Sequence, residues 1–213
     1  MSCLPSRATA VLAVALALLG ARPAVAKGYL DDWHPNQTYW AVGWSAAVPV
    51  TSLRAGFISD TGWLGGGADI RIGVVGRLAV GVSGTWTWMD QTFPSLTLEQ
   101  PPSLTFTGPV YRRLSATTVL ATAHYYLGSG NVQPFVGVGV GGVWFSTLVQ
   151  VVNRPQNSYT SGLAVAGELG LLFTVAQQLG IYLSGRYQLN LATIDGAANP
   201  QWVSGQAGVA YYF

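Results

Sequence analysis

The chain has 213 residues, of which 50% are hydrophobic and only 8% are charged, whereas soluble domains contain about 25% charged residues. If Arg7 and Arg22 are removed with a signal peptide, eight of the ten basic residues remain to balance eight acidic ones. This composition disfavours an ordinary soluble domain, and the near-zero net charge argues against a nucleic-acid partner.

Residues 1–26 have the pattern of a secretory signal peptide. Arg7 precedes the apolar run Ala8–Ala21, and Ala24 and Ala26 form an A-x-A cleavage site. The run is shorter than the about 20 residues that a transmembrane helix needs; a buried N-terminal helix is the alternative. Cleavage would also remove the one cysteine, so we expect no disulfide and no thiolate chemistry in the mature chain.

The rest of the chain alternates between strand patterns and breaks. The seventh strand segment shows the period of two most clearly, because Leu183 and Tyr187 alternate with Ser184 and Arg186. Each segment is long enough for a tilted membrane crossing of about 9–11 residues. The eight predicted strands are Thr38–Val48, Gly62–Val74, Arg77–Gln91, Arg112–Leu127, Val132–Val151, Tyr159–Val175, Leu179–Ala192 and Gln201–Phe213.

The connections alternate between tight turns and longer polar loops, of which residues 92–111 form the longest. This pattern is typical of outer-membrane barrels, which have short periplasmic turns and longer external loops. The sequence therefore predicts an all-β protein, an eight-stranded antiparallel up-and-down transmembrane β-barrel over residues 38–213. A soluble barrel of the lipocalin kind, with apolar residues inside, is the alternative.

Aromatic residues gather near the ends of the predicted strands, where their rings suit the lipid–water interfaces. They are Trp40, Trp86, Trp88, Tyr125, Trp144, Tyr159, Trp202, Tyr211 and Phe213.

Four charged residues fall inside predicted strands: Asp69, Arg71, Glu168 and Arg186. We expect them to face the lumen, because Arg or Lys on the lipid face at mid-depth costs about 2–4 kcal/mol. Two acids and two bases predict a paired network that plugs the barrel. The alternative is a polar constriction that lines a conduit.

No catalytic, cofactor or metal site is predicted. Residues 137–142 fit G-x-G-x-x-G, but a strand pattern follows where a dinucleotide site needs a helix. His34 and His124 lie far apart in the chain and lack a serine or thiol partner, so neither an enzyme nor a metal centre is expected. The inward positions Gly137, Gly139 and Gly141 are predicted to let a narrow barrel close.

The chain resembles the small eight-stranded outer-membrane barrels of the OmpA/OmpX/OmpW-like group. The resemblance rests on "GWSAAVPV" (43–50), "AHYYLGSGNVQPFVGVGVGG" (123–142) and the terminal "AYYF". It implies that Val209, Tyr211 and Phe213 form the C-terminal signal read by the barrel assembly machinery, with periplasmic chaperones as further partners. We expect the protein to be a monomer, embedded in the outer-membrane lipid of a Gram-negative-type bacterium.

An even number of strands places both ends of the barrel chain in the periplasm, with residues 27–37 as a periplasmic N-terminal segment. Two functions follow from these patterns. In the first, the barrel is structural or makes surface contacts through its outer loops, and its lumen is plugged. In the second, it is a narrow conduit for small apolar or polar solutes, for which the small inward residues of two strands leave room. Those residues are Gly137, Gly139, Gly141, Gly162, Ala164 and Ala166.

Overall fold

The structure is a computed structural model that describes residues 38–213, apart from 101–103, 129, 152–153 and 195–196. The predicted signal peptide, its cleavage site at Ala24 and Ala26, and the segment 27–37 lie outside the described residues. Within the described part of the chain, no helix is long and apolar enough to cross a membrane.

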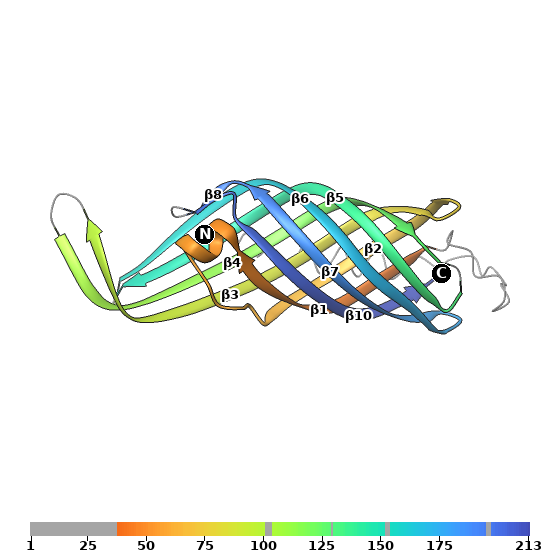
Figure 1. The fold of residues 1–213 in the computed structure, drawn as a ribbon, viewed down its shortest axis with the longest axis horizontal. Coiled ribbons are helices and arrows are strands. Elements are labelled where there is room, and N and C mark those ends of the chain that lie inside the picture. The colour runs from red at the N-terminus through yellow and green to blue at the C-terminus, as the bar shows by residue number, and fades with distance from the viewer. Residues whose placement is uncertain (1–37, 101–103, 129, 152–153, 195–196) are drawn as a thin grey trace, which may run out of the picture.

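Eight long antiparallel strands close into a barrel, as the sequence predicts (Figure 1). Around the barrel the order is β1, β10, β7, β6, β5, β4, β3 and β2, so that strands joined by short connections are neighbours. These strands are β1 (Tyr39–Val50), β2 (Leu64–Val75), β3 (Leu78–Gln100), β4 (Leu104–Tyr126), β5 (Val132–Val151), β6 (Arg154–Ala176), β7 (Leu179–Leu191) and β10 (Gln201–Tyr212).

Three short elements lie outside the barrel wall. The helix α2 (Thr51–Gly56) follows β1, and the two-residue strands β8 (Thr193–Ile194) and β9 (Ala197–Ala198) pair with each other between β7 and β10. The sequence predicts only loops at these places.

The first and last strands close the barrel. Their register runs from Tyr39 opposite Tyr212 to Val50 opposite Gln201, and β10 pairs with β7 on its other side. The last strand is therefore hydrogen-bonded along both edges, which is what an ordered strand near a chain end requires.

The two ends of the barrel differ. The start of β1, the end of β10 and the tight connections β2–β3, β4–β5 and β6–β7 lie together at what we call the turn end. The turn at Gly76 has φ of 52°, which glycine adopts readily. The other end, which we call the hairpin end, carries α2, β8, β9 and the long β3–β4 and β5–β6 hairpins (Figure 1).

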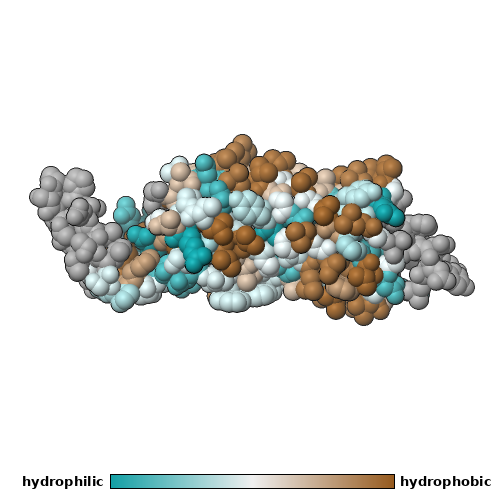
Figure 2. Space-filling view, in the orientation of Figure 1, coloured by the Kyte–Doolittle hydropathy of each residue, from teal (hydrophilic) through white to brown (hydrophobic). Residues whose placement is uncertain are grey.

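The outward face of the barrel wall is apolar, whereas the inward face carries the buried polar side chains together with two apolar clusters. On β7, Ile181, Leu183 and Tyr187 are exposed, whereas Ser184 and Arg186 are buried. Exposed apolar residues recur on the outside of all eight barrel strands, and Figure 2 shows broad apolar areas on the barrel wall. This distribution is the reverse of a soluble lipocalin-type barrel, and it fits a wall that faces lipid.

The prediction of a long loop at residues 92–111 is wrong for most of that segment. β3 and β4 continue pairing through this segment, with Phe93 opposite Val110 and Gln100 opposite Leu104. A register shift between Phe93 and Leu96 coincides with Pro94, where a missing N–H is tolerated. The hairpin projects from the barrel and bends near its base (Figure 1). The predicted loop 152–158 is similarly shortened, because β6 begins at Arg154.

Candidate functional site

The structure brings all four predicted charged residues together inside the barrel. Asp69 and Arg71 lie on β2, Glu168 on β6 and Arg186 on β7, each on the inward face of its strand. All four are buried, with exposed fractions between 1% and 7%. We call this group the lumen charge network.

Glu168 is the centre of the lumen charge network. Its Oε2 accepts hydrogen bonds from Nη2 of Arg186 at 2.7 Å and from Nε at 3.3 Å, and its Oε1 accepts one from Nη2 of Arg71 at 3.1 Å. Glu168 and Arg186 are direct cross-strand partners, so the register itself sets this contact. Charge-assisted bonds of this kind are about twice as strong as neutral ones.

Asp69 completes the charge balance without making a close contact. Its Oδ1 lies 3.7 Å from Nη2 of both Arg71 and Arg186. Neither carboxylate oxygen of Asp69 has a hydrogen-bond partner among the described residues. The network thus contains two formal negative and two formal positive charges in a region that water does not reach freely, where an unbalanced charge is costly.

The sequence interpretation missed His124 as a neighbour of this network. His124 faces inward on β4, and its Nε2 lies 3.4 Å from Oε2 of Glu168. Its ring fills the space beside Gly137, its register partner on β5, where an added Cβ would overlap the imidazole. The alternation of β4, with Thr122 and Tyr126 also buried, is the signal that could have placed His124 inside.

The inward glycines therefore accommodate neighbours instead of leaving space. A Cβ at Gly139 would lie 3.2 Å from Cδ1 of Leu120, and one at Gly141 would overlap the backbone of Val119. Beside Gly137 and Gly139, side chains of β4 already occupy volume in which a solute was expected to fit. This weakens the conduit interpretation along β5.

An aromatic cluster lies between the charge network and the turn end. The hydroxyl oxygens of Tyr39 and Tyr126 are 2.6 Å apart, and the Tyr39 and Tyr212 rings meet edge to face at 5.7 Å. The guanidinium of Arg71 lies 4.7 Å from the centre of the Phe135 ring, so the two layers are in direct contact. The members of this turn-end cluster are Tyr39, Ala41, Ala79, Tyr126, Phe135, Leu172, Tyr182, Ala210 and Tyr212.

Polar side chains follow the charge network on its other side. Nε2 of Gln188 donates to Oγ1 of Thr118 at 3.0 Å and to Oδ1 of Asn190 at 2.7 Å. Nδ2 of Asn190 in turn donates to the Pro200 carbonyl at 2.7 Å. These bonds join β7, β4 and the segment before β10 across the lumen.

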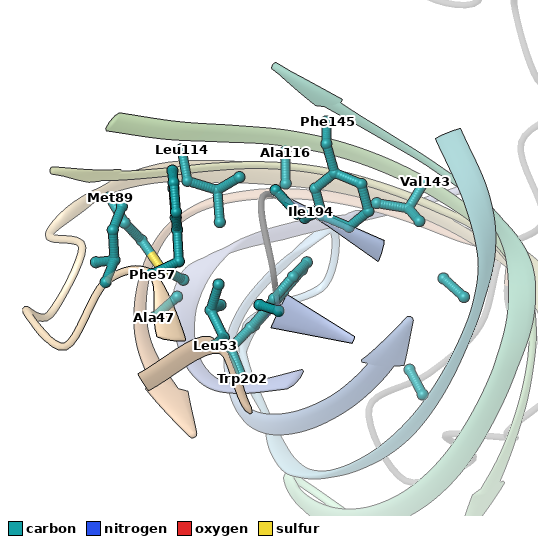
Figure 3. Packing of buried hydrophobic residues seen from close by; sticks show 14 of the residues in the cluster. Ala47, Leu53, Phe57, Met89, Leu114, Ala116, Val143, Phe145, Ile194 and Trp202 are labelled. Carbon is teal, nitrogen blue, oxygen red and sulfur yellow. The ribbon is translucent and has the colours of Figure 1, made fainter. Parts of the chain in front are cut away.

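A larger apolar cluster fills the hairpin end, where α2 acts as a lid (Figure 3). Leu53, Phe57 and Ile58 are buried beside Trp202, although they belong to a segment predicted as an outer loop. Burying side chains of this size stabilises the folded state by about 1.5–3 kcal/mol each. The hairpin-end cluster is Ala47, Leu53, Phe57, Ile58, Met89, Leu114, Ala116, Leu120, Val143, Phe145, Ala164, Ala166, Ile194, Ala197 and Trp202.

Hydrogen bonds hold the α2 segment against the barrel strands at the hairpin end. Oγ of Ser52 donates to the Ala198 carbonyl at 2.6 Å, and Nη1 of Arg112 donates to the carbonyls of Gly56 and Phe57 at 3.2 and 3.0 Å. The α2 segment is thus held by Arg112 of β4 and by Ala198 of β9.

Most of the predicted interfacial aromatics face outward, but Trp202 does not. Trp202 is buried against Phe145, with ring centres 6.1 Å apart, because its position on β10 alternates with the outward Val203. Trp44 and Trp63 instead stack outside at 6.4 Å. At the turn end, Trp40, Tyr211 and Phe213 are in contact, with Tyr211 6.0 Å from Trp40 and 5.4 Å from Phe213.

The residues assigned to the assembly signal lie on the outward face near the end of the last strand. Val209 is exposed, and the Tyr211 hydroxyl donates to Oε1 of Gln178 at 3.2 Å. The backbone N–H of Phe213 donates to the carbonyl of Thr38 at 3.0 Å. Recognition of these residues by the assembly machinery stays a prediction. Among the described residues, no group of three or more His, Cys, Asp or Glu side chains could hold a metal ion.

Comparison with solved structures defines the class of fold. Neisserial surface protein A matches with a TM-score of 0.57 at 15% identity, over 83% of this chain and 97% of that one. The attachment invasion locus protein Ail of Yersinia pestis, solved with the heparin analogue sucrose octasulfate, gives 0.51 at 14% identity, over 83% and 98%. OprG of Pseudomonas aeruginosa, an outer-membrane protein, gives 0.52 at 12% identity, over 87% and 99%.

The chain therefore has the fold of the small eight-stranded outer-membrane β-barrels, as the resemblance in its sequence predicts. No protein-family model and no curated relative matches the chain. These likenesses define the architecture of the chain alone.

Proposed function

We propose that the protein is a plugged outer-membrane barrel with a structural or surface-contact role, with both barrel termini in the periplasm. The observation that supports the proposal is the succession of buried side-chain layers inside the barrel. The turn-end cluster, the lumen charge network, the polar side chains around Gln188 and the hairpin-end cluster follow one another along the barrel. An eight-stranded barrel has an interior just wide enough for its side chains to fill.

The projecting β3–β4 hairpin supports a surface-contact role. Beyond Trp88, the last β3 residue that pairs with β2, one edge of β3 has no strand partner among the described residues. Unpaired strand edges offer backbone groups to an added strand. Ail, which has the same fold, is an attachment invasion locus protein and was solved in complex with a heparin analogue. That likeness supports a contact role for the present barrel.

The conduit remains a second candidate because of one observation. Several buried polar atoms near the charge network have no hydrogen-bond partner among the described residues, among them Oδ1 and Oδ2 of Asp69, Oγ of Ser184 and Oε1 of Gln206. Such groups are usually satisfied by ordered water. A conduit would nevertheless require both apolar clusters to open.

A liposome-swelling assay with small uncharged solutes separates the two functions. The mature chain is refolded into vesicles, and swelling rates are compared with protein-free vesicles. The plugged barrel predicts no increase in rate for any solute. A rate that rises with protein content and falls with solute size would support the conduit and overturn the plug.

A further inference from the structure

The outward face of β3 shows where the lipid-facing band ends. Outward positions are apolar or small from Leu78 to Trp88, and the next outward residue is the exposed Asp90. Ten residue steps of about 3.3 Å, tilted by about 40°, rise about 25 Å. That height equals the apolar band of an outer-membrane barrel, about 25 Å. Asp90 and its cross-strand partner Arg113 therefore lie at the membrane boundary of the hairpin end.

Arg113 is held at this boundary by aromatic side chains. Its guanidinium carbon lies 4.4 Å from the centre of the Trp88 ring and 5.3 Å from the centre of the Tyr111 ring. Its Nε donates to the Tyr111 hydroxyl at 3.0 Å. Arg113 and Asp90 form no ion pair within 4.0 Å among the described residues, although they are register partners.

These contacts orient the guanidinium and leave both of its Nη groups without a hydrogen-bond partner in the described part of the chain. A planar guanidinium presents its N–H groups in a fork that matches phosphate oxygens. Stacking on Trp88 and Tyr111 restricts the side chain before any ligand binds, which lowers the entropy cost of binding.

We propose that Arg113, positioned by Trp88 and Tyr111, binds a phosphate group of a lipid headgroup in the outer leaflet. The ligand class is a phosphorylated lipid, because the site adjoins the lipid-facing band and Trp88 offers a surface for its apolar part. Asp90 is the register partner of Arg113, and its negative carboxylate repels a phosphate, which lowers the affinity of the site. The proposal rests on the orientation proposed above, with the hairpin end outside.

The test uses the full mature chain labelled with ¹⁵N-arginine and refolded in detergent micelles. The probe is a bisphosphorylated glucosamine-disaccharide lipid, and two controls are the same lipid without phosphates and inorganic phosphate. The Nε–H resonance of Arg113 is assigned by its loss in Arg113→Lys.

We expect a saturable shift of this resonance with the phosphorylated lipid alone. An equal shift with the dephosphorylated lipid, or no shift, overturns the proposal. A response as strong to inorganic phosphate assigns the site to free phosphate and overturns the lipid ligand.

Lipid occupancy, measured by native mass spectrometry, provides the second readout. Arg113→Gln should weaken binding at least about tenfold, as expected for loss of charge-assisted hydrogen bonds, and Asp90→Asn should strengthen it. Arg77→Gln is the matched control, because Arg77 is an exposed arginine at the turn end. Equal losses in Arg113→Gln and Arg77→Gln would contradict a specific site. Micelles have no sides, so this result does not depend on the orientation, which cysteine labelling tests separately.

Discussion

Glu168 of β6 lies directly opposite Arg186 of β7, and Nη2 of Arg186 donates to Oε2 of Glu168 at 2.7 Å inside the barrel. Glu168 also accepts a hydrogen bond from Arg71 of β2, so it links strands on different sides of the lumen. This carboxylate is the one group that contacts both arginines at hydrogen-bond distance among the described residues. It is therefore where we expect the lumen charge network to be most sensitive to substitution.

We predict that Glu168→Gln destabilises the barrel by about 3–5 kcal/mol, because two buried arginines lose their closest negative partner. The measurement is the free energy of unfolding in urea, with the chain refolded in lipid vesicles. Arg186→Met combined with Glu168→Gln should recover part of the loss. A double variant as unstable as the sum of the single variants would show that the two residues are not coupled.

Gly137→Ala should destabilise the barrel, because the added methyl group overlaps the ring of His124. Overpacking of this kind costs about 1–3 kcal/mol. The same urea experiment checks it, and His124→Ala in the same chain should remove most of the penalty. A Gly137→Ala barrel with wild-type stability would mean that the His124 ring lies elsewhere.

The outward face of β5 offers a test of lipid contact. Val138 is 65% exposed on the outside of that strand. An arginine on the lipid face costs about 2–4 kcal/mol near the bilayer midplane but about 0–1 kcal/mol near the interface. We expect Val138→Arg to show the larger loss of unfolding free energy and Tyr159→Arg, near the hairpin end, the smaller one. Equal losses would argue against the membrane position inferred from the apolar band.

The proposed orientation can be tested because the mature chain is predicted to contain no cysteine. Ser95 is exposed on the β3–β4 hairpin and Gln177 is exposed at the turn end. A membrane-impermeant maleimide should label Ser95→Cys on intact cells, and Gln177→Cys only after the outer membrane is permeabilised. The reverse pattern would place the hairpin end and its Arg113 site on the periplasmic side.

The barrel is predictable because strand alternation is a local property of the sequence. Leu183, Ser184 and their neighbours on β7 assign both faces without knowledge of any partner strand. The same alternation places Asp69, Arg71, Glu168 and Arg186 on inward positions. Which of these residues meet depends on register and on barrel closure, which is why the central place of Glu168 could not be read from the chain.

The errors share a physical cause, because each concerns a contact that a local pattern does not encode. Proline, serine and threonine suggest a loop at residues 92–111, but the two strands form a hairpin that tolerates Pro94 at a register shift. The contact of His124 with Glu168 crosses the lumen. Trp202 lies near a strand end, but its parity on β10 directs it inward. The α2 segment is held by contacts with strands distant in the sequence. The pattern of its own residues therefore does not predict that it folds over the hairpin end.

Conductance of the refolded mature chain in a planar bilayer tests the central claim most directly. A 16-stranded porin refolded in the same way provides the positive control, because barrels of that size leave an aqueous channel. The plugged lumen predicts a folded barrel without steady ion current. Steady channels of defined size, with an ion selectivity that changes in Glu168→Gln, would show that the lumen charge network lines a pore and would contradict the plug.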